Sequence, residues 1–280
     1  MTTTERASAD TLVDRPSLRS LVEDLHERRE RARLGGGEEK IAQQHERNKL
    51  TARERLALLI DEGRFTELGI HGRPHFSQRA MEGREDPADG EITGYGKVDG
   101  RLVAVAAYDF TVMAGSMGMT GEMKVARLRE LALGKRIPMI WLLDSAGARI
   151  QEAVGSLFAG SGHLFREEVI MSGVIPQVAA LMGPCAAGTA YIPGLADFVP
   201  MVRGRGSMAL AGPHLVRAAI GEVEERTLPY VVEMIGDDNE LLVDEGHFRE
   251  AEMRALLFEL RPEMVPRESL LVALQQGETE

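Results

Sequence analysis

The apolar residues near the N-terminus recur at the spacing of a helix. Over residues 17–34, four of them stand at positions i, i+3, i+4 and i+7 among many charged residues: Leu18, Leu21, Val22 and Leu25. This spacing predicts an amphipathic helix. Gly35-Gly36-Gly37 follows directly, so we expect the helix to end there at a break or hinge.

A second helix is predicted after Thr51. Thr51 and Glu54 have the spacing of a capping box, and three apolar residues supply a buried stripe before Gly63: Leu56, Leu59 and Ile60. We interpret the two helices as an N-terminal arm. Residues 71–90, rich in glycine, proline and charge, are predicted to be a connecting loop.

Beyond residue 90 the pattern changes to short apolar strands. Residues 92–97 and 102–108 flank Asp99-Gly100, which is the expected centre of a tight hairpin turn. Residues 138–143 and 175–182 are continuous apolar runs, typical of strands buried on both faces.

Helical periodicity separates these strands. After Gly121, one face of a predicted helix carries Val125, Leu128 and Ala132, and a further helix is predicted over residues 164–171. Strand, helix and strand therefore succeed one another at the spacing of an α/β domain. We expect three parts: the arm and its loop over residues 1–90, the α/β domain over 91–221, and a C-terminal segment over 222–280.

The C-terminal segment has a weaker pattern. Residues 230–235 predict a strand, and a helix that ends at Pro262 is predicted from four apolar residues: Met253, Leu256, Leu257 and Leu260.

Composition narrows the class of function. The chain has 280 residues, of which 44% are hydrophobic and 28% charged, as in ordinary globular proteins. A formal net charge of -11 argues against a nucleic-acid partner, because neutralising phosphates needs a surplus of lysine and arginine. An anionic ligand would need a locally positive pocket.

A single cysteine, Cys185, can form neither an internal disulfide nor a cysteine zinc site, which favours a reducing cytoplasm. We find no stretch of 18 apolar residues and no signal-peptide pattern, so we expect neither export nor membrane insertion.

The usual catalytic motifs are missing from the sequence. There is no Gly-x-Ser-x-Gly elbow and no His-Glu-x-x-His, and the seven histidines have no ligand spacing. We therefore expect no metal, no nucleophilic serine and no bound nicotinamide.

Three loops of small residues follow predicted strands, at residues 114–118, 144–150 and 183–189. Ligands of α/β sheets gather at the carboxyl ends of strands, and small residues let a ligand approach the backbone. Tight packing of helices on strands explains any one such loop equally well, but three together favour a binding site. The N–H groups of Ala187 and Gly188 could stabilise a thioester enolate without a titratable side chain.

Cys185 has no adjacent base, so we interpret it as a packing residue.

These loops carry a family resemblance. The chain resembles the N-terminal domain of the β subunits of propionyl-CoA and related acyl-CoA carboxylases, in order from about Glu38 to Gly221. The segments that carry the resemblance are Lys49–Leu56, Asp61–Gly63, Asp109–Val112, Gly115-Ser116, Asp144–Glu152, Ser172–Gln177, Gly183–Gly188, Asp197-Phe198 and Gly212-Pro213.

The resemblance implies a crotonase-like (ClpP/crotonase) ββα spiral with an N-terminal helical arm. It implies a carboxyltransferase component of a biotin-dependent acyl-CoA carboxylase, which binds an acyl-CoA and stabilises its enolate. The co-substrate would be carboxybiotin on a partner carrier protein, whose nitrogen removes the α-proton after CO2 is released. No covalently bound cofactor is implied. The implied partners are a second carboxyltransferase-like chain, biotin carboxylase and its carboxyl carrier protein, in a homo- or hetero-oligomer.

The resemblance also assigns roles to residues. The oxyanion pair falls on Ala187 and Gly188, and the residues expected near the CoA are Gly115, Ser116, Ser145, Ala146, Gly147, Ala148, Arg149 and Ile150. Many members have Gly-Gly where this chain has Ala146-Gly147 and Ala187-Gly188, so we expect a slightly tighter pocket that keeps its N–H donors.

Two further departures leave alternatives open. After Gly221 the usual stretch that ends in a Gly-Gly pair is not evident and the carboxybiotin domain is absent, and a zinc ribbon is also missing. The first hypothesis is a carboxyltransferase component that works with a separate biotin-side partner. The second is a self-sufficient crotonase-like acyl-CoA decarboxylase, and the third is a non-enzymatic CoA-binding or assembly protein.

Overall fold

The computed structural model describes residues 16–75, 79–152, 162–211 and 242–243. Several predictions lie outside these ranges: the strand over 230–235, the helix that ends at Pro262, the Gly212-Pro213 segment and nearly all of the segment 222–280. Among the described residues, no helix has the length and apolar character needed to cross a membrane.

The arm contains the two predicted helices and one more: α1 (Leu18–Arg33), α2 (Glu38–Glu46) and α3 (Ala52–Leu59). The capping box of α3 is present, with Glu54 N–H donating to Thr51 Oγ1 and Thr51 N–H donating to Glu54. At the predicted break, residues 35–37, the chain packs closely against the domain, because a side chain at Gly36 would overlap the carbonyl oxygen of Thr111. Gly36 N–H also donates to Thr111 Oγ1 at 3.0 Å, so the break docks the arm on the domain.

The domain is built on a mixed sheet in the order β1-β2-β3-β4-β5-β6-β8, with β7 paired to β5. The first three strands are antiparallel: β1 (Thr66–Leu68), β2 (Glu91–Val98) and β3 (Arg101–Tyr108). The others run parallel: β4 (Met139–Ser145), β5 (Gln177–Ala186), β6 (Met201–Val202), β7 (Ser207–Ala209) and β8 (Leu242–Val243). The predicted hairpin is confirmed, with Asp99 at φ 50° and Gly100 at φ 80° in its turn.

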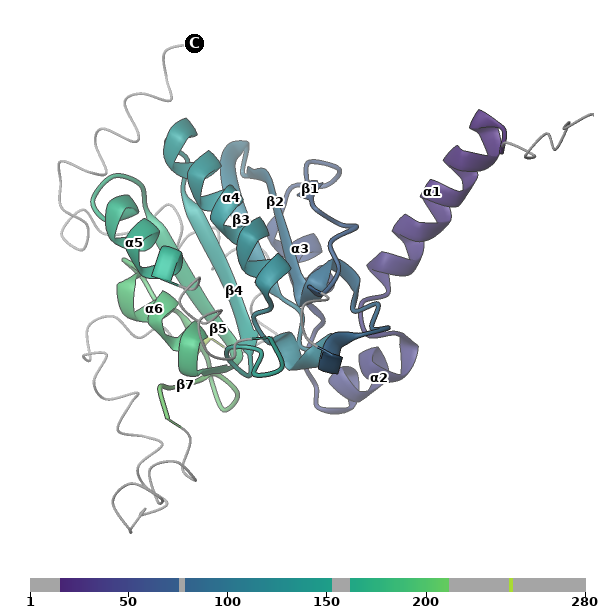
Figure 1. The fold of residues 1–280 in the computed structure, drawn as a ribbon. Helices are drawn as coiled ribbons and strands as arrows, with labels where there is room; N and C mark the ends of the chain where they lie inside the picture. The colour runs from purple at the N-terminus through teal and green to yellow at the C-terminus, as the bar shows by residue number, and fades with distance from the viewer. Residues whose placement is uncertain (1–15, 76–78, 153–161, 212–241, 244–280) are drawn as a thin grey trace, which may run out of the picture.

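Both faces of the sheet are covered, which explains the continuous apolar runs of its strands. Helices α4 (Met119–Lys135), α5 (Gly162–Met171) and α6 (Tyr191–Leu195) cover one face, and α3 covers the other (Figure 1). Strand β3 shows the alternation, because Ala104 and Ala106 pack toward α4 whereas Val103 and Val105 pack toward α3. The predicted stripe of α4 is buried as expected, and the α/β class is confirmed.

Two strands end later than the sequence predicted. β4 continues to Ser145 and β5 to Ala186, whereas the sequence pattern predicts strands that end at residues 143 and 182. The additional strand residues belong to the predicted small-residue loops. The reason is pairing, since Ser145 pairs with Cys185 and residues 184–186 pair with β7. Short elements with little hydrophobic pattern were not predicted: β1, β6, β7, β8, α2 and α6.

Candidate functional site

The three small-residue loops meet at the carboxyl ends of β3, β4 and β5. Met117 forms a parallel bridge with Ala148. Met117 N–H donates to Gly147 O, and Arg149 N–H donates to Met117 O, both at 2.9 Å. Ala146 N–H donates to Ala114 O at 3.0 Å. The backbone of the first loop is therefore joined to that of the second loop along its length.

The third loop packs against the other two. A side chain at Gly147 would lie 2.6 Å from Ala186 O and 3.1 Å from Ala187 Cβ. The corresponding position at Gly188 lies 3.3 Å from Met117 Cε and 3.6 Å from Ala148 Cβ. Tight packing therefore explains the glycine at position 147, which is the alternative to a binding role for the small residues. The same packing brings Gly188 beside the other two loops.

The proposed oxyanion pair lies at an exposed turn where the chain passes from β5 into η5 (Ala187–Ala190). Ala187 is exposed and adopts φ 49°, the left-handed region that L residues rarely occupy. The first N–H groups of a helical turn have no partner inside that turn, so Ala187 and Gly188 are suitable donors to a ligand oxygen. Ala146 and Ile150 are exposed nearby, Ile150 at 78%.

Arg149 lies below this surface as the centre of a buried ion cluster. Its guanidinium donates to Asp89 and to Glu152 Oε1, the second at 3.0 Å. It also donates to Asp89 O at 3.0 Å, to Ser116 O at 2.9 Å and to Ser116 Oγ at 3.2 Å. Burial disfavours its charged form, yet Asp89 and Glu152 outweigh that effect and raise the pKa of Arg149. The side chain that we expected near the CoA therefore holds two loops together from beneath.

A second buried ion cluster surrounds Asp144, at the end of β4. Its carboxylate accepts from Lys49 Nζ at 2.8 Å, from Arg55 Nη1 at 3.0 Å and from Gln44 Nε2 at 3.2 Å. Burial lowers the pKa of Lys49 despite the nearby Asp144. The register of β4 against β5 shifts between Leu143 and Ser145, so Asp144 marks an irregularity that the arm stabilises.

The single thiol is buried beneath the turn that follows β5. Cys185 is 1% exposed and its Sγ donates to Thr189 O at 3.2 Å. Burial raises the pKa of Cys185 to about 12, so the thiol stays protonated. These observations support the interpretation of Cys185 as a packing residue. Within the described ranges, no group of His, Cys, Asp and Glu side chains is arranged to hold a metal ion.

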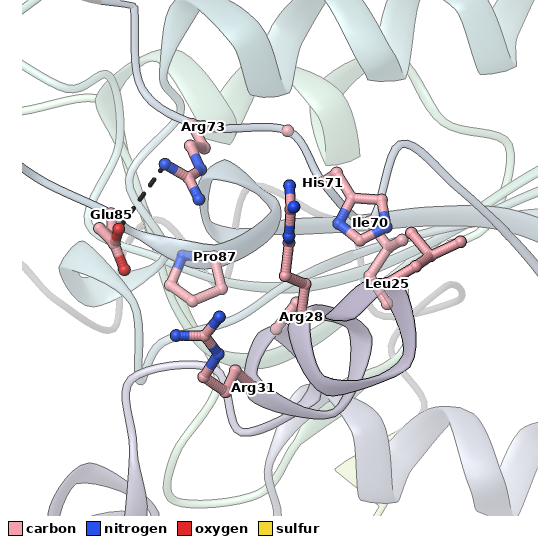
Figure 2. Close-up of a pocket in the computed structure, with 10 residues that line it drawn as sticks. Leu25, Arg28, Arg31, Ile70, His71, Arg73, Glu85 and Pro87 are labelled. Atoms are coloured by element: carbon pink, nitrogen blue, oxygen red, sulfur yellow. Dashed lines mark ion pairs between the residues drawn. The ribbon is translucent and has the colours of Figure 1, made fainter. Parts of the chain in front are cut away.

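A basic pocket of about 450 Å³ lies between α1 and the loop that leads to β2 (Figure 2). Arg28 and Arg31 of α1 face Arg73 and His71 across it, and Glu85, which pairs with Arg73 at 3.6 Å, is its acidic residue. An anionic ligand needs a locally positive pocket in a chain of net charge -11, and no pattern in the sequence located this one.

Sequence reasoning also missed the supports of the site. Asp144, Lys49 and Arg55 lie inside the segments that carried the family resemblance, but no pattern within the sequence pairs residues 89 and 95 positions apart. Asp89, 60 positions from Arg149, was missed for the same reason, whereas Glu152 lies only three positions away, inside a segment that carried the resemblance, and was given no role. One feature of the sequence could have indicated such supporting residues: a charged residue among apolar or small ones, as at Asp144 after a run of buried apolar residues.

The fold and these loops define a crotonase-like α/β protein. Sequence comparison identifies the particular family, since the model of the carboxyl transferase domain matches residues 43–239. The chain belongs to the carboxyl transferase domain family.

Two relatives show the range of this family. The chain is 46% identical over 201 residues to a propionyl-CoA carboxylase carboxyltransferase subunit of Haloferax mediterranei. It is 44% identical over 201 residues to a methylmalonyl-CoA decarboxylase subunit alpha of Veillonella parvula. Each match covers 72% of this chain and 39% of the relative, so the chain spans about two fifths of the length of these relatives.

Solved structures agree with this assignment. Transcarboxylase 12S, a hexamer solved with methylmalonyl-coenzyme A bound, matches with a TM-score of 0.80 and 36% identity over 87% of this chain and 48% of its own. The beta subunit of geranyl-CoA carboxylase from P. aeruginosa matches with a TM-score of 0.65 and 27% identity, over 87% and 44%.

Proposed function

We propose that this chain is the acyl-CoA side of a biotin-dependent carboxyltransferase. The observation that carries the proposal is the meeting of three strand-end loops at the turn formed by Ala187, which is exposed, and Gly188, which is half-buried. The membership of the carboxyl transferase domain family supports it. Among the described residues, the exposed positions at and beside the turn, Ala146, Ile150 and Ala187, carry no titratable side chain, which suits a reaction whose base is the co-substrate.

In the proposed reaction the thioester oxygen accepts hydrogen bonds from Ala187 N–H and Gly188 N–H. Carboxybiotin releases CO2, and the biotin nitrogen then takes the α-proton of the acyl group. The enolate oxygen gains negative charge, which the two preorganised donors stabilise, and the enolate carbon forms the new bond to CO2. The remaining loop residues, Gly115, Ser116, Ser145–Ala148 and Ile150, hold the CoA beside the turn. Arg149 acts in this proposal as a positioning residue.

The biotin side is proposed to come from a second carboxyltransferase-like domain, with carboxybiotin delivered by a carrier protein and its biotin carboxylase. We propose an oligomer that works in the cytoplasm. The division into an arm, residues 1–90, an acyl-CoA domain, 91–221, and a C-terminal segment, 222–280, remains part of the proposal.

A second candidate activity is decarboxylation of an acyl-CoA. It rests on the similarity to methylmalonyl-CoA decarboxylase alpha subunits of Veillonella parvula and Propionigenium modestum, at 44% and 41% identity. An enolate forms in either direction, so the same oxyanion turn would serve both reactions.

The test compares two substitutions at Gly188 in the complex that this chain forms in its native host. Gly188→Pro removes the N–H donor, whereas Gly188→Ala keeps it and adds a methyl group 3.3 Å from the flexible end of Met117. We expect Gly188→Pro to lower carboxyl transfer to propionyl-CoA by about 10²–10³, the loss typical of one oxyanion donor. Gly188→Ala should retain most of the activity.

Circular dichroism must show that both variants are folded. Equal activity of folded Gly188→Pro and Gly188→Ala would reject the turn as the oxyanion site. Release of CO2 from methylmalonyl-CoA without biotin would favour decarboxylation instead of transfer.

A further inference from the structure

We infer that Met117 is a positioning residue, whose side chain sets the direction of the Gly188 N–H group. The inference rests on the proposed function, because it concerns one donor of the same oxyanion turn. Met117 lies in the first small-residue loop, two residues before α4 begins at Met119. Its side chain is 7% exposed and belongs to the hydrophobic core between the sheet and helices α4, α5 and α6. It is therefore surrounded largely by packed residues.

The backbone of Met117 is fixed by the second loop. Met117 N–H donates to Gly147 O, and Arg149 N–H donates to Met117 O, both at 2.9 Å. Met117 also forms a parallel bridge with Ala148. The next residue is packed just as closely, since a side chain at Gly118 would overlap the guanidinium of Arg149. The side chain of Met117 therefore starts from a defined position.

This side chain reaches the third loop at Gly188. A side chain at Gly188 would place its Cβ 3.3 Å from Met117 Cε, 3.6 Å from Ala148 Cβ and 3.8 Å from Ala148 N. Carbon atoms in ordinary van der Waals contact lie about 3.5–4.0 Å apart. The space on this side of Gly188 is therefore bounded by Met117 and Ala148, which we call the wall, and a methyl group fits there only if Met117 shifts slightly.

Hydrogen bonds of side chains hold the turn on both sides of Gly188. Thr189 Oγ1 donates to Ala186 O at 2.9 Å, and Cys185 Sγ donates to Thr189 O at 3.2 Å. Gly188 itself has no side chain, and the backbone of glycine has the widest choice of conformations. The wall therefore limits how far the peptide unit that carries the Gly188 N–H can rotate.

The direction of this N–H decides how well it stabilises the enolate, because an oxyanion donor acts only when it is aimed at the oxygen. A displacement of about 1 Å can lower turnover by about 10². Truncation of Met117 widens the space beside Gly188 and lets the peptide unit turn away from the thioester. A methionine that served only the core would instead change stability and leave the turnover of the folded enzyme unchanged.

The experiment measures kcat and KM for carboxyl transfer to propionyl-CoA in the complex that this chain forms in its native host. Met117→Ala removes the thioether, and Met117→Leu keeps most of its volume. Met123→Ala is the matched control, because Met123 is a methionine of α4 that is 67% exposed. If circular dichroism shows that Met117→Ala is unfolded, Met117→Val, which also lacks the thioether, takes its place.

We expect Met117→Ala to lower kcat by about 10- to 100-fold. The KM should change little, because the loop surface that binds the CoA remains. Met117→Leu should retain most of the activity, since leucine and methionine replace each other well in packed interiors. Met123→Ala should match the wild type. An unchanged kcat in folded Met117→Ala would show that Met117 serves only the core and would overturn the inference.

A second substitution tests the wall itself. Gly188→Ala places a methyl group in the space that Met117→Ala widens. The loss of kcat caused by Met117→Ala should therefore be smaller in the Gly188→Ala background than in the wild type, by about tenfold, which is within the range for residues in contact. Equal losses in both backgrounds would mean that Met117 does not act through Gly188, and would overturn the inference.

Crystal structures of the wild type and of Met117→Ala separate this inference from the proposed function. We expect the Gly188 nitrogen to move by about 1 Å relative to Ala148. A nitrogen that stays in place would overturn the role of Met117, whether or not the wild type transfers carboxyl groups. If the nitrogen moves but the wild-type complex transfers no carboxyl group to propionyl-CoA, Met117 positions the turn and the proposed function fails.

Discussion

The two buried ion clusters of this protein have central side chains of opposite charge. In one, the carboxylate of Asp144 lies between Lys49 and Arg55, and in the other the guanidinium of Arg149 lies between Asp89 and Glu152. Both central side chains are at most 1% exposed. They lie five residues apart, Asp144 near the end of β4 and Arg149 in the loop that follows it.

Their partners show what each cluster holds. Asp144 binds side chains from the arm, 89 to 100 residues earlier, so it fixes the arm to the sheet. Arg149 binds the backbone and side chains of Asp89 and Ser116 and the side chain of Glu152, so it joins the segments on either side of its own loop. The comparison teaches that similar ion pairs serve different purposes: the first cluster should govern stability, and the second should govern the geometry of the loops.

The largest expected effect is the loss of the Asp144 carboxylate. Asp144→Asn leaves Lys49 and Arg55 buried without their counter-charge, and breaking a buried pair in this way costs about 3–5 kcal/mol. Urea unfolding should show this fall in the free energy of unfolding. Glu130→Gln, at a carboxylate 58% exposed, is the control and should change little. A loss below about 1 kcal/mol for Asp144→Asn would show that the cluster does not hold the arm.

Arg149→Lys tests the other cluster through activity. Lysine keeps the charge but cannot reproduce the five-donor fork that reaches Asp89, Ser116 and Glu152. Displacement of the loops by about 1 Å should lower turnover by about 10². The KM for a pantetheine thioester should change less than kcat, because the binding surface persists. If turnover and stability both match the wild type, the loops do not depend on Arg149.

A buried carboxyl without an ion partner sharpens the comparison. Glu168 of α5 is fully buried, and neither of its carboxylate oxygens has a hydrogen-bond partner among the described residues. Burial raises its pKa to about 9, Arg129 opposes that rise, and Glu122 and Glu167 add to it. The folded protein therefore keeps a proton that the unfolded chain releases above its ordinary pKa of 4.5.

Stability should consequently fall as the pH rises from about 5 to 9, because the folded state binds more protons over that range. Glu168→Gln needs no proton and should stabilise the protein by up to about 5 kcal/mol at pH 8, with little effect at pH 4. Urea unfolding at both pH values measures the difference. An equal effect at pH 4 and pH 8 would contradict the protonated state of Glu168.

The smallest effect is expected at the turn itself. Ala187 adopts φ 49°, which costs an L residue about 1–2 kcal/mol. Glycine removes that cost but loses about 0.5–1 kcal/mol through backbone entropy. Ala187→Gly should therefore change the free energy of unfolding by about 1 kcal/mol or less, without loss of the N–H donor. A large loss of activity would show that the alanine methyl group takes part in binding.

The sequence predicted the elements that are specified by local patterns of residues. The stripe of α4 at Val125, Leu128 and Ala132, the capping box at Thr51 and the Asp99-Gly100 hairpin are all local patterns, and all three are present. The end of β5 was misplaced because it is extended by pairing with β7, in which Met208 pairs with Cys185, 23 residues earlier in the chain.

For the site, the sequence predicted the loops but not what holds them. Small residues at strand ends can be recognised one loop at a time, so Gly115, Gly147 and Gly188 were found. The role of Arg149 could not be derived, because a guanidinium on a loop suits a phosphate as well as it suits Asp89, 60 residues away. Only the fold decides between these partners.

The most direct test of the proposed oxyanion turn is the infrared stretching frequency of a ¹³C-labelled thioester carbonyl in propionyl-CoA bound to this chain. Two N–H donors aimed at the oxygen polarise the C=O bond. The account therefore predicts that the band moves to lower frequency on binding to the wild type. The shift should persist in Gly188→Ala and diminish in folded Gly188→Pro. A bound thioester whose carbonyl band stays at its frequency in water, or shifts equally in all three proteins, would contradict the account.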